Sequence, residues 1–207
     1  MSIDPCRLFV LQTEPQTGAF RRLFLNGKFG HKPPAVEDAP HRFLLDTGAT
    51  RLILTERMLE GAEADAVEFV GSGCPGIHDG ARIPARDAGQ CLVPFGGFHW
   101  SYRTARVRFL LYEDWDSGSA IARFTAEDAR VLGQVVSFRR CGGDLFIKQV
   151  RPPERREDVP HPVVGCDPVL QHCLLLADRN GDGDEATAVL LLDPDVVRAA
   201  RSQLLAP

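Results

Sequence analysis

The chain has 207 residues, of which 44% are hydrophobic and 25% are charged, and this composition is typical of a folded globular protein. The length suffices for one well-filled core, or for one small domain that carries a large insertion. The formal net charge of -4 comes without a concentrated basic run, which argues against nucleic acid or an anionic membrane as a partner. No stretch approaches about 18 consecutive apolar residues, so no transmembrane helix is expected.

The N-terminus and the cysteines bear on the compartment. Residues 1–5 lack the charged start and apolar core of a secretory signal. The chain has 6 cysteines, widely spaced and without a C-x-x-C pair, which favours reduced thiols over a disulfide framework. Together these features predict a cytoplasmic protein.

The first third of the chain has the pattern of strands. Residues 7–12 and 20–25 are short apolar runs, and the Pro and Gly between them predict a hairpin. A longer excursion leads to the apolar run 43–45, which stops abruptly at Asp46. A strand is expected at each of these three runs.

After Asp46 the sequence again predicts short elements. Residues 52–54 are expected as a strand, with Thr55 capping a short helix over 56–60. The stretch 71–80 is a loop with Gly and Pro, and two further strands are expected at 90–95 and 104–112.

The region 113–162 is interpreted as an insertion on a β fold. Residues 125–136 predict a helix with Thr125 as its cap, and 151–160 are interpreted as an exposed linker. Beyond the insertion, we expect strands at 162–165, 174–177 and 188–192 and a helix over 194–205.

The residues best suited to chemistry are 43–50, an apolar strand that delivers the Asp46 carboxylate into a turn of small residues. Hydrolysis of a peptide bond without a metal or a covalent nucleophile needs one carboxylate to activate water and a second acid to protonate the carbonyl oxygen. Two such acids within a few ångströms share one proton, because both cannot ionise. Gly48 lets the backbone approach the carboxylate, and the hydroxyls of Thr47 and Thr50 are suited to fix the loop.

A second signature lies near the C-terminus, where Val163 and Val164 are followed by Gly165, any residue, Asp167, a spacer and Leu170. With the first signature, it resembles the retropepsin-like aspartic peptidases. The resemblance covers roughly residues 22–59 and 162–192. It implies a mostly β, closed-barrel fold with one lobe per chain, so that residues 1–207 form a single domain with a partly helical insertion.

The resemblance also implies roles for individual residues. Asp46 would be the catalytic carboxylate, Thr47 the hydroxyl that locks the loop, and Gly48, Ala49 and Thr50 its supports. Gly165 would pack against that loop. A glycine-rich flap over the substrate is expected within 71–80, at Gly71, Gly73 and Gly76.

The number of loops that could carry a catalytic Asp determines whether one chain or two would form the active site. Asp116, Ser117, Gly118 and Ser119 are the alternative second loop, but no buried strand precedes them. We therefore expect a homodimer in which each subunit contributes Asp46, acting as an endopeptidase on a polypeptide substrate through an activated water. No cofactor and no metal is expected.

Other interpretations remain beside this one. The residues Asp-Thr-Gly are common in turns of any β protein, and the fold could persist as a non-catalytic dimerisation or peptide-binding module.

Two further segments resemble metal sites. Residues 178–183 match the first half of an EF-hand loop, but Val189 stands where the bidentate Glu is needed, so a hairpin turn is favoured. Cys166, His172 and Cys173 lack a second ligand pair with the spacing of a zinc site, and are interpreted as packing cysteines and a surface histidine.

Overall fold

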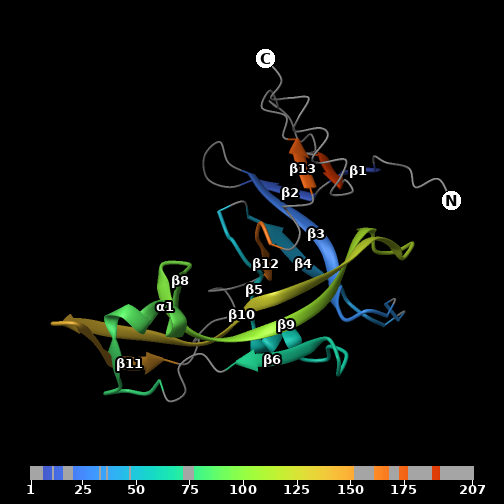
Figure 1. The fold of residues 1–207 in the computed structure, drawn as a ribbon. Coiled ribbons are helices and arrows are strands. Elements are labelled where there is room, and N and C mark those ends of the chain that lie inside the picture. The colour runs from blue at the N-terminus through green and yellow to red at the C-terminus, as the bar shows by residue number, and fades with distance from the viewer. Residues whose placement is uncertain are drawn as a thin grey trace.

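The computed structural model describes residues 7–10, 12–15, 21–32, 34–35, 37–46, 48–71, 77–151, 161–167, 173–176 and 188–191. Strands dominate these residues, and helices are few and short (Figure 1). The mostly β fold class that the sequence predicts is confirmed. None of the described helices is long and apolar enough to cross a membrane.

The main sheet has eleven strands. Its spatial order is β6 (Val67–Gly71), β9 (Phe98–Asp114), β3 (Arg21–Phe29), β4 (His41–Leu45), β12 (Val163–Val164), β5 (Ile53–Thr55), β10 (Ser119–Cys141), β11 (Asp144–Arg151) and β7 (Arg82–Pro84), with β2 (Gln12–Pro15) on β3 and β8 (Leu92–Phe95) on β9. Because β9 also pairs with β10, the pairings form a ring through β9, β3, β4, β12, β5 and β10.

The longest elements are β9 and β10, which have 17 and 23 residues and form one antiparallel hairpin that crosses the molecule (Figure 1). The predicted helix over 125–136 is wrong, because these residues lie inside β10. Its register against β9 shifts between Ala126 and Ala129 and again between Leu132 and Val135. Such bulges add residues to one strand, so the buried side chains of β10 lose their strict alternation and imitate helical spacing.

The interior of the ring is apolar, and a stack of Phe rings crosses it. Phe43 of β4 stacks on Phe109 of β9 at 5.4 Å between ring centroids, and Phe109 stacks on Phe124 of β10 at 5.5 Å. Phe43 and Phe109 are fully buried, and burial of such a side chain contributes about 1.5–3 kcal/mol. The core therefore fixes β4, the strand that leads to Asp46.

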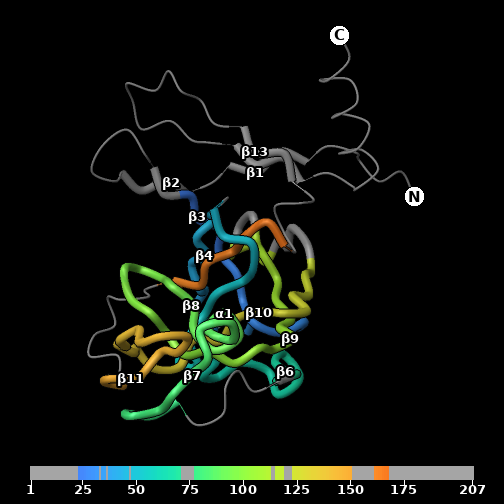
Figure 2. The backbone as a smooth tube through the Cα atoms, turned by 60° about the vertical axis from the view of Figure 1, so that its left-hand side comes forward, coloured from blue at the N-terminus to red at the C-terminus, as the bar shows by residue number. Residues whose placement is uncertain are grey.

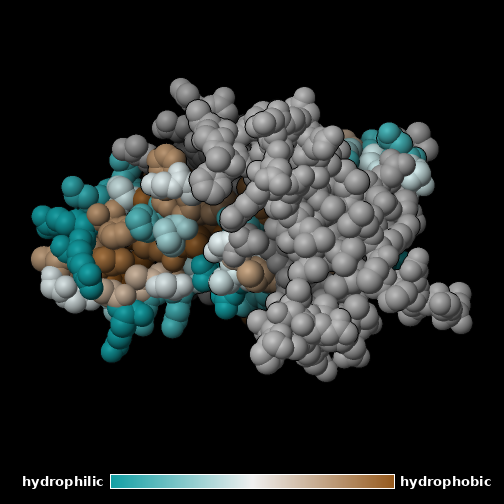
Figure 3. Space-filling view, turned by 90° about the horizontal axis from the view of Figure 1, so that it is seen from above, coloured by the Kyte–Doolittle hydropathy of each residue, from teal (hydrophilic) through white to brown (hydrophobic). Residues whose placement is uncertain are grey.

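The other end of the molecule has a smaller core of its own. There α1 (Ala88–Cys91), after the short 3-10 helix η2 (Ala85–Asp87), lies near β9 (Figure 2), and the Tyr102 hydroxyl donates to the Gly89 carbonyl at 2.7 Å. Seen from above, hydrophobic residues gather at the end where β8, α1 and β11 lie, with hydrophilic residues around them (Figure 3). The buried members of this core are Ile83, Cys91, Leu92, Val136, Leu145 and Ile147.

A separate three-stranded sheet joins the two ends of the chain. It has the order β1 (Arg7–Val10), β14 (Ala188–Leu191) and β13 (Cys173–Leu176). The predicted hairpin between 7–12 and 20–25 is therefore wrong for β1, whose partner is β14, whereas β2 does pair with β3. The strands expected near 174–177 and 188–192 are confirmed, and the helix expected over 194–205 lies outside the described residues.

The short elements after Asp46 agree with the sequence. The strand β5 is followed by the 3-10 helix η1 (Glu56–Leu59), with Thr55 as its N-cap and Gly61 just past its end at a φ of 79°. Regarding the cysteines, Cys141 and Cys166 are exposed and not disulfide-bonded, so the interpretation of Cys166 as a packing cysteine is wrong, whereas Cys91 is disulfide-bonded. The prediction that all the cysteines are reduced is thus wrong for Cys91, and the cytoplasmic location stays a prediction.

Candidate active site

The loop that carries Asp46 joins the end of β4 to β5. Phe43 and Leu45 of β4 point into the core, and the chain then turns so that the Asp46 side chain is exposed. The Gly48 N–H donates to Asp46 Oδ1 at 2.8 Å, and the Ala49 N–H donates to the Asp46 carbonyl at 3.1 Å. One carboxylate oxygen is thereby oriented by the backbone of its own loop.

The strand β12 lies between the two strands that flank this loop. It runs parallel to β4, with Val163 beside Leu44 and Val164 beside Leu45, and antiparallel to β5. The Asp46 N–H donates to the Val164 carbonyl at 3.0 Å. The backbone of Asp46 is therefore held by a segment more than a hundred residues away in the sequence.

Gly165 brings the second signature directly against the loop. After it, the Cys166 N–H donates to the Ala49 carbonyl at 2.9 Å, and the Asp167 N–H donates to the Thr50 carbonyl at 3.0 Å. A Cβ atom at Gly165 would lie 2.4 Å from the Ala49 oxygen, so a side chain has no room there. The close approach of the two segments requires glycine.

An ion pair supports the loop from its other side. Arg51 Nε lies 2.8 Å from Asp128 Oδ2, and Asp128 stands in the bulge of β10 between Ala126 and Ala129. The neighbouring Arg130 N–H donates to the Leu52 carbonyl at 2.8 Å. Nothing in the sequence pattern pointed to Asp128, because its contact depends on the bulge that turns its side chain.

The remaining predicted positions divide into three groups. Thr47, Gly73 and Gly76 lie outside the described residues, so the flap stays a prediction, and Gly71 is the last residue of β6. The alternative acid loop at Asp116 is the turn of the β9–β10 hairpin, closed by the Gly118 N–H donating to the Trp115 carbonyl at 3.1 Å. Residues 178–183 and His172 lie outside the described part of the chain.

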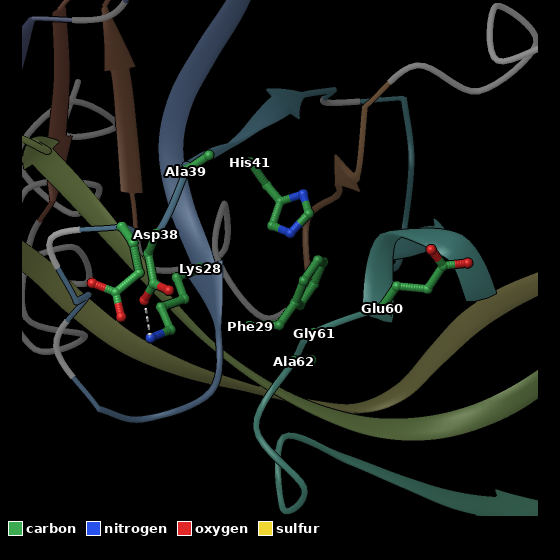
Figure 4. Close-up of a pocket in the computed structure, with 9 residues that line it drawn as sticks. Lys28, Phe29, Asp38, Ala39, His41, Glu60, Gly61 and Ala62 are labelled. Carbon is green, nitrogen blue, oxygen red and sulfur yellow. Dashed lines mark hydrogen bonds and ion pairs between the residues drawn. The ribbon is translucent and has the colours of Figure 1, made fainter.

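A hollow of about 220 Å³ lies at the start of β4, away from Asp46. Figure 4 shows the rings of His41 and Phe29 beside each other at its wall, 5.0 Å apart. Burial lowers the pKa of His41. The residues that line the hollow are Lys28, Phe29, Glu37, Asp38, Ala39, His41, Glu60, Gly61 and Ala62.

One wall of this hollow is an ion pair. Lys28 Nζ lies 2.6 Å from Asp38 Oδ2 (Figure 4). Burial lowers the pKa of Lys28, but its hydrogen bond to Asp38 gives a net rise above the ordinary value. The same hydrogen bond, with one from the Ala35 N–H, lowers the pKa of Asp38. Both groups are therefore charged at neutral pH and occupied with each other.

Comparison with known proteins adds one structural likeness. No protein-family model matches the chain, and no curated protein matches it. The chain is similar to the crystal structure of a retropepsin-like aspartic protease from Rickettsia conorii, with 9% sequence identity and a TM-score of 0.38 over 90% of this chain and 92% of that chain. At these values the likeness assigns neither family nor activity.

Proposed function

We propose that the chain is an aspartic endopeptidase of the retropepsin-like type, active as a homodimer. In this proposal the ring of strands is the closed barrel of that fold, and each subunit contributes one Asp46 to a shared catalytic pair. The substrate is a polypeptide bound in an extended form between the two loops.

The observation that carries the proposal is the way the loop presents Asp46. The carboxylate is exposed at the end of a buried strand, and its backbone is fixed by Val164 on one side and by Ala49 on the other. Gly48 orients Oδ1, and within the described part of the chain no donor binds Oδ2. The close packing of Gly165 against this loop favours a functional role over a turn that merely ends a strand.

A second subunit is needed because one carboxylate cannot act as base and acid at once. The alternative acid of the same chain, Asp116, lies in a hairpin turn rather than at the end of a buried strand. A two-fold axis beside the loop brings two Asp46 side chains together without any further motif, and such isologous dimers are the commonest oligomers.

In the dimer the two carboxyl groups share one proton. The ionised Asp46 takes a proton from water, whose oxygen attacks the carbonyl carbon of the peptide bond, while the protonated Asp46 donates its proton to the carbonyl oxygen. The tetrahedral intermediate then returns the hydroxyl proton to a carboxylate, the C–N bond breaks, and the amine leaves with the proton that came from water. Activity is expected to be greatest at mildly acidic pH, where one proton per pair is retained.

The decisive experiment compares Asp46→Asn with Asp116→Asn. Purified proteins are incubated with a mixed peptide library, products are identified by mass spectrometry, and oligomeric state is measured by sedimentation velocity. We expect a dimer in all three proteins, cleavage by the wild type and by Asp116→Asn, and none by Asp46→Asn.

Two outcomes would contradict the proposal. A wild-type dimer that cleaves nothing across the mildly acidic range would identify the chain as a non-catalytic dimerisation or peptide-binding module. Cleavage that survives Asp46→Asn would place the catalytic machinery elsewhere.

A further inference from the structure

A cluster of three side chains that are potential metal ligands lies away from Asp46. His31 follows β3, while Glu63 and Asp65 lie in the segment between η1 and β6. One ligand atom of each lies within 4.8 Å of the others, which brings an imidazole nitrogen and two carboxylate oxygens to one point. This cluster belongs neither to the proposed active site nor to any motif in the sequence.

Glu63 is held in one orientation by the chain after β3. The His31 N–H donates to Glu63 Oε2 at 3.2 Å, and the Lys32 N–H donates to Oε1 at 3.1 Å. Gly30 has a φ of 129°, and a Cβ atom there would lie 2.5 Å from the Glu63 carboxyl carbon. The carboxylate is therefore placed before any ligand binds. Although burial raises it, the pKa of Glu63 lies below its ordinary value because of these N–H groups and the nearby positive charges.

The position of the His31 ring is the observation that points to a cation. Its Nδ1 atom lies 3.2 Å from Glu63 Oε2 and 3.3 Å from Asp65 Oδ2. The His31 ring makes no hydrogen bond to either oxygen. The hydrogen bond from His31 to Glu63 is donated by its backbone N–H. Nδ1 therefore points at neither oxygen. An imidazolium paired with a carboxylate would approach to about 2.7–2.9 Å in a direct line.

The two distances from Nδ1 to the carboxylate oxygens agree with the edges of a metal coordination shell. A tetrahedral zinc ion with N and O ligands at about 2.0–2.1 Å separates neighbouring ligand atoms by about 3.3 Å. Imidazole with carboxylates is a ligand set that suits zinc and similar divalent transition metals. A nitrogen almost equidistant from two carboxylate oxygens fits such a shell better than it fits a hydrogen bond.

The charges around the cluster permit a cation. Lys28 Nζ lies 3.7 Å from Glu63 but is paired with Asp38 at 2.6 Å. Arg108 Nη1 donates to the Asp65 backbone carbonyl at 2.8 Å and lies 3.8 Å from its carboxylate. The carboxylates of Asp38, Glu63 and Asp65 carry three negative charges, and Lys28 and Arg108 carry two positive charges, so these side chains leave one net negative charge beside the cluster.

We propose that His31 Nδ1, Glu63 Oε2 and Asp65 Oδ2 bind a divalent transition metal ion of the zinc class, with water completing the shell. The ion would fasten the chain after β3 to the segment that leads into β6. It takes no part in peptide hydrolysis, so the inference does not depend on the proposed function.

The test uses zinc itself as the probe, with the full chain freed of metal by a chelator. Isothermal titration calorimetry measures uptake by the wild type and by His31→Ala and Asp65→Asn, a half-buried and an exposed ligand whose loss should leave the fold intact by circular dichroism. His78→Ala and Asp79→Asn are the matched controls, since they change exposed residues of the same types. Cobalt replaces zinc in a parallel titration, because its visible absorption reports the coordination number.

We expect uptake of one zinc ion per chain, accompanied by a rise in Tm. Affinity should fall at least about tenfold in His31→Ala and in Asp65→Asn and stay unchanged in both controls. The proposal is overturned if the wild type takes up no zinc, or if zinc binds the two ligand variants as tightly as the wild type, which would assign the uptake to the cysteines.

Discussion

Two loops of this molecule are fastened in opposite ways. The Asp46 loop is held by backbone groups of Ala49, Val164 and Cys166, and its one carboxylate is left exposed. The loop after β3 is held by a side chain, because both oxygens of Glu63 are occupied by the N–H groups of that loop.

This difference bears on what each loop is suited to do. Hydrogen bonds between backbone groups do not change between neutral and acidic pH. Apart from the Gly48 N–H that donates to Asp46 Oδ1, the frame of the first loop is therefore expected to stay in place while the carboxylate gains or loses a proton. The second loop depends on the charge of Glu63 and on the groups around it, so it is expected to respond to protonation and to cations. This difference agrees with the two proposals, catalysis at the first loop and metal binding at the second.

The largest effect is expected from Gly165→Ala, which disturbs the backbone contacts that hold the first loop. The new methyl group would overlap the Ala49 carbonyl and the Arg51 N–H, so β12 has to move away from the loop. We expect a loss of about 3 kcal/mol in the free energy of unfolding, together with loss of peptidase activity. Urea denaturation measures the first effect and peptide cleavage the second.

The matched control is Gly143→Ala, in the turn between β10 and β11, where a Cβ atom would meet nothing within 4 Å. It should change the unfolding free energy by less than about 0.5 kcal/mol. Equal stability of the two variants would show that β12 does not press on the Asp46 loop.

Glu63→Gln tests the second loop. The amide keeps one oxygen acceptor but puts an NH₂ group against a backbone N–H, so either His31 or Lys32 loses its acceptor. We expect a loss of about 1–2 kcal/mol in the free energy of unfolding, measured by urea denaturation. Glu60→Gln, on the exposed C-cap of η1, should cost far less, and a similar loss in both variants would contradict the role given to Glu63.

His41, at the start of β4, should give the frame of the first loop a pH dependence of its own. Burial lowers its pKa in the folded state, so below the ordinary value of about 6.5 the unfolded chain binds a proton that the folded chain does not. Stability should therefore fall as the pH falls from about 7.5 to about 5, with a slope from this residue of at most about 1.4 kcal/mol per pH unit.

Urea denaturation across this pH range checks the sign. His41→Gln should flatten the dependence, whereas His99→Gln, which changes an exposed ring on β9, should leave it as in the wild type. A wild-type slope that survives His41→Gln would assign the effect to other groups.

Much of the first loop could be predicted from the sequence because its signals are local. An apolar run ending at Asp46, small residues after it, and a cap at Thr55 before η1 each follow from neighbouring residues, and the structure has β4, β5 and η1 there. Gly165 was expected from the resemblance to the retropepsin-like peptidases, which rests on a short motif of apolar residues followed by a glycine.

The rest could not be predicted, because it depends on distant partners. The bulges of β10 depend on its pairing with β9. They disturb the alternation of buried side chains, so part of this strand of 23 residues was predicted as a helix. The pairing of β1 with β14 joins the two ends of the chain. Glu63 and His31 are 32 residues apart in the sequence and share no motif, so neighbouring residues do not predict their contact.

The smallest expected effect comes from Asp128→Asn, which removes the side chain of β10 that pairs with Arg51 beside the Asp46 loop. Arg51 and Asp128 are both about 40% exposed, at 41% and 38%, so water and salt screen their attraction. Such pairs contribute about 0.2–1 kcal/mol, so urea denaturation should show only a small loss. If peptidase activity nevertheless falls severalfold while stability hardly changes, the ion pair orients the loop for catalysis, because a purely structural pair would lower both together. A double-mutant cycle with Arg51→Gln measures the coupling between the two side chains. A coupling near zero in both stability and activity would show that the ion pair does not support the Asp46 loop.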